Sequence, residues 1–187
     1  MYKSNYNTHD VKILTAIENL IDKSVKLRNK NLYVRIDIRY PENIQYPNDN
    51  CALSVFLDSF KHYCDRKKLG LIYFWIREAS LNSDTATHHY HAIFLLDGRY
   101  IQNPYKILEK ATYLWGKRLG CDATGLVHYC RHKNNTHPNP YAIQIRRTSP
   151  DAAEVIYEVK QNAQYLAKRH SKENYLCRTK QFACSLI

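Results

Sequence analysis

Two histidines and a glutamate have the residue types and the spacing of a metal site. His89 and His91 stand two apart in a strand-like run from His88 to Leu96, so their side chains should face the same side. Glu78 ends an earlier apolar run, and a hairpin centred near Asp84 would bring it opposite the imidazoles. Two nitrogens and one oxygen suit a divalent ion, for which we expect Mg²⁺ or Mn²⁺, with zinc as the alternative.

The alternative interpretation is a pair of ordinary surface histidines on an edge strand. The apolar run from Ala92 to Leu96 favours a central strand instead, where a polar cluster needs a partner or a function. His88 should lie on the opposite face, and we do not expect it to be a ligand.

A downstream helical stretch carries a tyrosine that could act as a nucleophile. Tyr165 lies about 90° from the centre of the apolar stripe of this helix, whereas Tyr157, in the similar string ending at Lys160, lies about 170° away and should face solvent. A metal and the ammonium of Lys168, one helical turn on, would help the hydroxyl attack a phosphate. Lys168 could instead neutralise the phosphate or assist proton movement. With the histidines, this indicates metal-assisted attack by a tyrosine on a phosphodiester.

The elements that must position these residues follow an order typical of an α+β fold. Apolar periodicity predicts four helices, over residues 10–28, 53–68, 104–119 and 151 to about 170. Strand patterns cover residues 32–40, 71–78, 88–96, 126–130 and 141–145. We expect an antiparallel sheet of the split βαβ (ferredoxin- or RRM-like) type, with helices packed on it and a C-terminal catalytic helix.

Length and charge indicate the class of partner. The 187 residues suit one domain, and 28 basic against 17 acidic residues give a net charge of +11. Such a charge favours a polyanion, either nucleic acid or an anionic membrane surface. No apolar segment approaches the length of a membrane span, and the acidic residues Asp10, Glu18 and Asp22 argue against a secretory signal, so we expect a cytoplasmic protein.

The six cysteines include no Cys-x-x-Cys pair, which favours reduced and mostly buried thiols. One window could bind zinc, but its spacings match no standard zinc motif. Its residues are Cys121, His128, Cys130, His132 and His137.

Four strings make the chain resemble the HUH endonucleases and, within them, the inovirus-type replication initiators of phages and prophages, also called the YagK/YfjJ C-terminal-domain family. The strings are Val34 to Pro41, Trp75 to Glu78, His89 to His91 and Tyr165 to Lys168. The tail from Arg178 to Ser185 is also similar, although Ala183 stands where glycine would be expected. By this resemblance residues 31–187 would be an HUH-type nickase domain, and residues 1–30 a helical extension outside it.

The resemblance implies a complete catalytic set. Glu78, His89 and His91 would hold Mg²⁺ or Mn²⁺, and Tyr165, helped by Lys168, would cleave single-stranded DNA to leave a 5′-phosphotyrosine and a free 3′-hydroxyl that can prime rolling-circle replication. We expect one-tyrosine chemistry. The sequence has no Gly-x-x-x-x-Gly-Lys-Ser/Thr loop, so unwinding would need a separate helicase.

The expected partner is single-stranded or unwound origin DNA in a bacterial host. Basic residues late in the chain could hold its backbone while Tyr129 or Tyr141 stack on bases. These basic residues are Arg131, Lys133, Arg146, Arg147, Arg169, Lys172, Arg178 and Lys180.

Two alternatives stay open. A single-strand transposase or a plasmid-transfer relaxase would use the same chemistry. A non-catalytic RNA- or DNA-binding module could use the same sheet without cleaving anything.

Overall fold

The computed structural model describes residues 9–42, 44, 46–79, 88–131, 141–168 and 179–185. The helices are α1 (Val11–Leu27), α2 (Cys51–Arg66), α3 (Tyr105–Leu119) and α4 (Ala152–Gln164), and the 3₁₀ turn η2 (Tyr165–Ala167) follows α4. The strands are β1 (Lys30–Ile38), β2 (Ile72–Ala79), β3 (His88–Asp97), β4 (Val127–Tyr129), β5 (Ala142–Arg146) and β6 (Phe182–Cys184). The predicted hairpin turn at 80–87 lies outside the described residues.

The strands form one open antiparallel sheet in the order β4-β1-β3-β2-β6, and β5 pairs with the other end of β1. β3 is antiparallel to both β1 and β2, so these two strands run in the same direction on either side of it. This is the split βαβ arrangement that the element order predicted. The sheet also gains an unpredicted strand, β6, in which Ala183 pairs with Trp75.

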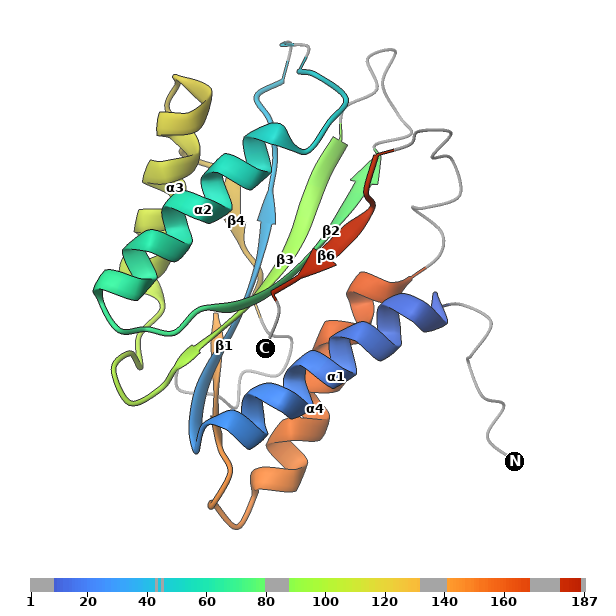
Figure 1. Ribbon diagram of the computed structural model, residues 1–187, viewed down its shortest axis with the longest axis vertical. Coiled ribbons are helices and arrows are strands. Elements are labelled where there is room, and N and C mark those ends of the chain that lie inside the picture. Colours follow the sequence, from blue (N-terminus) through green and yellow to red (C-terminus); the bar gives the residue numbers. More distant parts are fainter. Residues whose placement is uncertain are drawn as a thin grey trace.

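Helices cover both faces of the sheet, which confirms the predicted α+β class (Figure 1). α2 and α3 pack on one face, against the predicted core side chains Leu32, Val34, Ile36 and Ile38 of β1. α1 and α4 pack on the other face, where Tyr33 of β1 is fully buried. Because strand side chains alternate, Arg35 and Asp37 of β1 share with Tyr33 the face that α1 and α4 cover only in part. No helix in the described ranges is long and apolar enough to cross a membrane.

Helix α1 is bound at its start to η2, the turn that follows α4. Asp10 caps α1, accepting hydrogen bonds from the N–H groups of Lys12 at 2.9 Å and Ile13 at 3.2 Å. The Asp10 N–H itself donates to the carbonyl of Ala167 at 2.7 Å. Since the apolar face of α1 is buried in the same core as α4, the two helices form one layer on the sheet (Figure 1).

The C-terminal helix is shorter than predicted. It ends at Gln164 rather than near His170, Tyr165 begins a 3₁₀ turn, and Lys168 has an extended backbone with ψ of 137°. The hydrogen bond from Asp10 to Ala167 and a bridge between His9 and Lys168 tie this segment to α1. Apolar periodicity cannot reveal such a distant tie, so the predicted catalytic helix is corrected to a helix followed by a turn that carries Tyr165.

Candidate functional site

Glu78, His89 and His91 converge on the sheet face that also carries α1 and α4. The register of β2 and β3 places Glu78 opposite His89, as a hairpin centred near Asp84 predicted. Nε2 of His91 lies 3.1 Å from Oε2 of Glu78 and 3.2 Å from Nε2 of His89, and the remaining pair is 3.8 Å apart. Glu78 and His91 are buried whereas His89 is partly exposed, so the group has an open side. These three ligand atoms fit one divalent ion.

Asp37 supports this group from the neighbouring strand. It pairs with His91 across β1 and β3, and its Oδ1 lies 2.5 Å from Nδ1 of His91. Burial opposes the charging of His91, but the hydrogen bonds to Asp37 and Glu78 outweigh it and raise its pKa to about 9. Burial would raise the pKa of Asp37, but the hydrogen bond from His91 holds it below its ordinary value. A carboxylate partner of this kind orients a metal-binding imidazole.

His89 has the opposite electrostatic balance. Burial lowers its pKa, and the charge of His91 lowers it further. Both effects favour the neutral imidazole of His89, and a metal ion binds the neutral form.

Tyr165 lies beside the ligand group. The centroid of its ring is 5.8 Å from that of His91, with the two planes at 89°. Two cations flank the same ring: the guanidinium carbon of Arg35 is 4.9 Å from its centroid, and Nζ of Lys168 is 4.5 Å from it. Tyr165 is 44% exposed, so a substrate can reach it from solvent. The fold thus brings the two predicted halves of the site together.

The position of Tyr165 follows from how the end of α4 is anchored on β1. The hydroxyl of Tyr33 donates to Oδ1 of Asn162 at 2.8 Å, and Nη1 of Arg35 donates to the Asn162 carbonyl at 3.3 Å. Leu166, the next residue after Tyr165, is fully buried in the core beneath α1 and α4. With the chain held on both sides, the Tyr165 ring lies along the sheet toward β3.

The competing tyrosine is placed differently. Tyr157 is 64% exposed and lies about 12 Å further back along the helix axis, given the rise of about 1.5 Å per residue. Its companion Lys160 forms an ion pair with Asp22 of α1, with Nζ 2.7 Å from Oδ1. The ring contact with His91 is made by Tyr165, in agreement with the helix-face prediction.

The predicted DNA-binding arginines do not gather at one place among the described residues. Arg146 pairs with Lys30 at one end of β1, and Nη1 of Arg147 donates to the carbonyls of Val25 and Lys26 at the end of α1, where it helps to cap that helix. Lys133, Arg169, Lys172 and Arg178 lie outside the described residues.

Arg131 belongs to another part of the sheet. It follows Cys130, whose N–H donates to the carbonyl of Arg35, five residues along β1 from Lys30. That separation is about 17 Å along the strand, so Arg131 lies much nearer the ligand group than Arg146 does.

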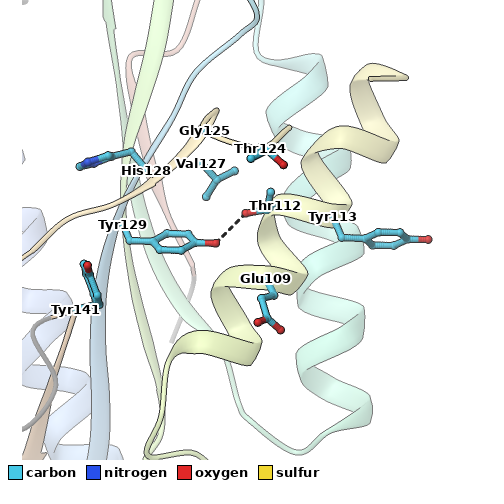
Figure 2. Close-up of a pocket in the computed structure, with 9 residues that line it drawn as sticks. All are labelled: Glu109, Thr112, Tyr113, Thr124, Gly125, Val127, His128, Tyr129 and Tyr141. Carbon is cyan, nitrogen blue, oxygen red and sulfur yellow. Dashed lines mark hydrogen bonds between the residues drawn. The ribbon is translucent and has the colours of Figure 1, made fainter. Parts of the chain in front are cut away.

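The two tyrosines predicted to stack on bases line a pocket between α3 and β4 (Figure 2). The hydroxyl of Tyr129 hydrogen-bonds to that of Thr112 at 3.1 Å, and its ring centroid lies 6.3 Å from that of Tyr141. His128 projects from the other side of β4 (Figure 2). The pocket is therefore on the face of the sheet opposite the ligand group.

The sequence prediction gave no role to three charged residues of the first strand segment. Arg35, Asp37 and Arg39 alternate with buried Ile36 and Ile38, so all three share the face of the ligand group. After burial and His91, the charge of Arg39 is a further cause of the lowered pKa of His89. The sequence did contain a signal for these residues, because three charged side chains on one face of an otherwise apolar strand indicate a functional surface.

Comparison with known proteins gives one match. The family model described as the YagK/YfjJ C-terminal domain matches residues 1–185. This range includes α1, which lies outside the span of the sequence resemblance. No curated protein and no solved structure matches the chain.

Proposed function

This chain belongs to the YagK/YfjJ C-terminal domain family, and we propose that it is an HUH-type endonuclease that nicks and rejoins single-stranded DNA. The observation that carries the proposal is the position of Tyr165, whose ring lies 5.8 Å from that of His91 at the edge of three converging ligands. A ligand group alone would suit many hydrolases, but an adjacent tyrosine favours covalent transesterification.

The ligand group suits Mg²⁺ or Mn²⁺, since it combines two imidazoles with a carboxylate and has an open side. A divalent ion bound there would polarise the oxygens of the scissile phosphate and offset their negative charge. The chain's own part is to hold Glu78, His89 and His91 on rigid strands, with Asp37 directing Nε2 of His91 toward the group.

Tyr165 performs the bond exchange in this proposal. Its Oη forms a bond to phosphorus while the bond from phosphorus to the 3′-oxygen breaks. The phenol proton passes to solvent, and the departing 3′-oxygen takes up a proton to become a hydroxyl. Attack by a 3′-hydroxyl on the phosphotyrosine reverses the step and rejoins the strand. One phosphodiester is exchanged for another, so no energy source is needed.

Arg35 and Lys168 stabilise the negative charge of this step. Both cations lie within 5 Å of the centroid of the Tyr165 ring, close enough to bind a phosphate held against it. Arg35 is also held by the carbonyl of Asn162, so its guanidinium is positioned before the substrate arrives. Preorganised cations of this kind lower a barrier because they need little rearrangement during the reaction.

The biological setting that we propose is rolling-circle replication of a phage or prophage-like element. The net charge of +11 and the cations around Tyr165 support a single-stranded or unwound DNA partner, and strand separation would come from a separate helicase. A transposase or relaxase would share the chemistry. Nicking at an origin next to the gene favours the initiator, whereas nicking at the ends of an element favours a transposase.

The test uses labelled single-stranded oligonucleotides that tile the DNA around the gene, with Mn²⁺. Wild-type protein should form a covalent adduct that survives denaturing electrophoresis, and Tyr165→Phe should form none. Tyr157→Phe is the matched control, since it removes the same atom from the neighbouring helix and should leave the adduct unchanged. An undiminished adduct in Tyr165→Phe would refute the assignment.

A second experiment tests whether adduct formation requires a metal ion bound by His89. His89→Ala should abolish Mn²⁺-dependent adduct formation while the protein still binds the oligonucleotide. A non-catalytic binding module would instead give metal-independent binding and no adduct even in the wild type.

A further inference from the structure

A second group of metal-binding side chains lies on the same face of the sheet, one strand beyond the first. Asp37 of β1 pairs with His128 of β4, and Cys130 follows two residues later. One ligand atom from each of the three lies within 4.8 Å of the others. Sγ of Cys130 donates a hydrogen bond to Oδ1 of Asp37 at 3.2 Å.

The second group repeats the construction of the first. In the first, Glu78 stands opposite His89, with His91 two residues on along the same strand. In both, a carboxylate on one strand faces two ligands at positions i and i+2 of its antiparallel neighbour, where directly opposed Cβ atoms are about 4.5–5.5 Å apart. Since Asp37 also binds His91, the ligand atoms form one continuous row across β4, β1, β3 and β2.

The side chains of the second group point in the direction that a metal site needs. The His128 side chain projects from β4 on the side opposite the Tyr129 ring, which faces α3 (Figure 2). Its side chain is exposed, whereas Cys130 is buried and Asp37 is half-buried. The group therefore has a buried inner side that holds two ligands and an outer side through which an ion can enter.

We propose that Asp37, His128 and Cys130 form a second metal site, which takes a thiolate-binding divalent ion such as Zn²⁺. The thiolate distinguishes it from the first group, because sulfur ligands select zinc over Mg²⁺ and Mn²⁺. Three protein ligands leave a fourth position of the tetrahedral ion for water. The ion would replace the proton that Cys130 now donates to Asp37.

The sequence window around Cys130 could not disclose this set. Of the residues of that window that the structure describes, only His128 and Cys130 belong to the group, and the carboxylate comes from β1, far upstream. Cys121, the first residue of the window, is exposed at the end of α3.

Sharing Asp37 couples the two sites. A carboxylate oxygen that binds Zn²⁺ is a weaker acceptor for Nδ1 of His91, so zinc in the second site should lower the affinity of the first site for Mn²⁺. By thermodynamic linkage Mn²⁺ must weaken zinc binding by the same factor, for which about 10-fold is a typical size.

Co²⁺ is the probe that separates the sites, because thiolate ligation gives a charge-transfer band that imidazole and carboxylate ligation do not. Full-length wild-type protein should bind two Co²⁺ ions, one of them with this band. Cys130→Ser should lose the band and one ion. His128→Gln should weaken the ion responsible for the band at least about 10-fold. His89→Ala should lose the other ion and keep the band.

Matched controls are the exposed cysteines: Cys51→Ser, Cys121→Ser and Cys184→Ser should all keep the band. Circular dichroism checks the fold of Cys130→Ser, and His128→Gln alters an exposed side chain, so it tests the site even if the cysteine variant unfolds. A wild type without the band, or a band unchanged in both Cys130→Ser and His128→Gln, would overturn the second site. A wild type that binds only the band-producing ion supports the second site and contradicts the metal dependence in the proposed function.

Discussion

Oδ1 of Asp37 lies 2.5 Å from Nδ1 of His91, across the central strands β1 and β3. With Nδ1 occupied, the other ring nitrogen of His91 faces Glu78 and His89. The geometry of the group formed by Glu78, His89 and His91 therefore depends on Asp37, which is not one of its three ligands. Such support from rigid strands keeps the ligand atoms in place before an ion binds.

Replacing Asp37 with asparagine should weaken Mn²⁺ binding to the first group by about 10- to 100-fold, the usual cost of losing a partner that orients a ligand. Asparagine keeps the shape but removes the charge that holds His91. Titration with Mn²⁺ followed by electron paramagnetic resonance measures the effect. Asp58→Asn, which alters an exposed carboxyl on α2, is the control and should change nothing. Equal Mn²⁺ affinity in wild type and Asp37→Asn would contradict the supporting role.

Removing the guanidinium of Arg35 should slow the reaction of Tyr165 without changing the metal site. Arg35→Met loses the cation beside the ring, and a charged hydrogen bond of about 1.5–3 kcal/mol corresponds to a rate loss of about 10- to 150-fold. Arg35→Lys should recover part of the rate, since it keeps the charge but not the planar donor group. Single-turnover adduct formation at saturating Mn²⁺ is the measurement.

Two further measurements distinguish an electrostatic role of Arg35 from a purely structural one. The Mn²⁺ affinity of Arg35→Met should match that of wild type. Arg146 lies in β5 and pairs with Lys30 at the far end of β1. Arg146→Met should weaken DNA binding without altering the rate of adduct formation in the DNA-saturated complex. If Arg35→Met reacts as fast as wild type, the proposed role of Arg35 is wrong.

Local pairing explains why the ligand group could be predicted from the sequence. β2 and β3 follow each other directly in the chain, so the positions of Glu78 and His89 relative to the midpoint between the two strands set their register. Asp37 and His91 lie on β1 and β3, and α2 and β2 come between these two strands in the sequence. No local spacing therefore encodes their pairing. The group of Asp37, His128 and Cys130 could not be predicted for the same reason, since Asp37 is far from the other two residues in the sequence.

The end of α4 and the basic residues were harder to predict for a related reason. Tyr165 begins a 3₁₀ turn whose last residue, Ala167, accepts a hydrogen bond from the N–H of Asp10, a residue near the other end of the chain. Arg131 and Arg146 are close in sequence, yet β4 and β5 pair with different ends of β1. Closeness in sequence therefore did not predict closeness on the surface.

Gly116→Ala should destabilise the protein although it lies in a helix. At an exposed helical position this change stabilises by about 1 kcal/mol. At Gly116, however, a Cβ would lie 2.6 Å from the carbonyl oxygen of Cys121, and that backbone is held by its own N–H bond to Gly116. We expect a loss of about 1–3 kcal/mol in the free energy of unfolding, measured in urea. Lys117→Ala, its exposed neighbour, should stay within about 0.5 kcal/mol of wild type, and a Gly116→Ala variant as stable as wild type would contradict the clash.

The ion pair at the end of β3 should make stability depend on pH in the acid range. The side chain of Arg99 donates to Asp97 through Nε and Nη2, which lowers the pKa of Asp97 below its ordinary value of 3.8 despite burial of the carboxyl. The folded state thus favours the charged carboxylate. The pair therefore stabilises the protein fully at pH values above the pKa of Asp97 in the unfolded state. This stabilisation is lost as the pH falls through the lower pKa of Asp97 in the folded state. Asp97→Asn should melt at a lower temperature than wild type near neutral pH, and the gap should close as the pH falls through the lowered pKa of Asp97 in the folded protein. Asp65→Asn, which breaks an exposed pair with Lys61, should show little change at either pH. A gap for Asp97→Asn that stays constant with pH would mean that the charge of Asp97 does not contribute.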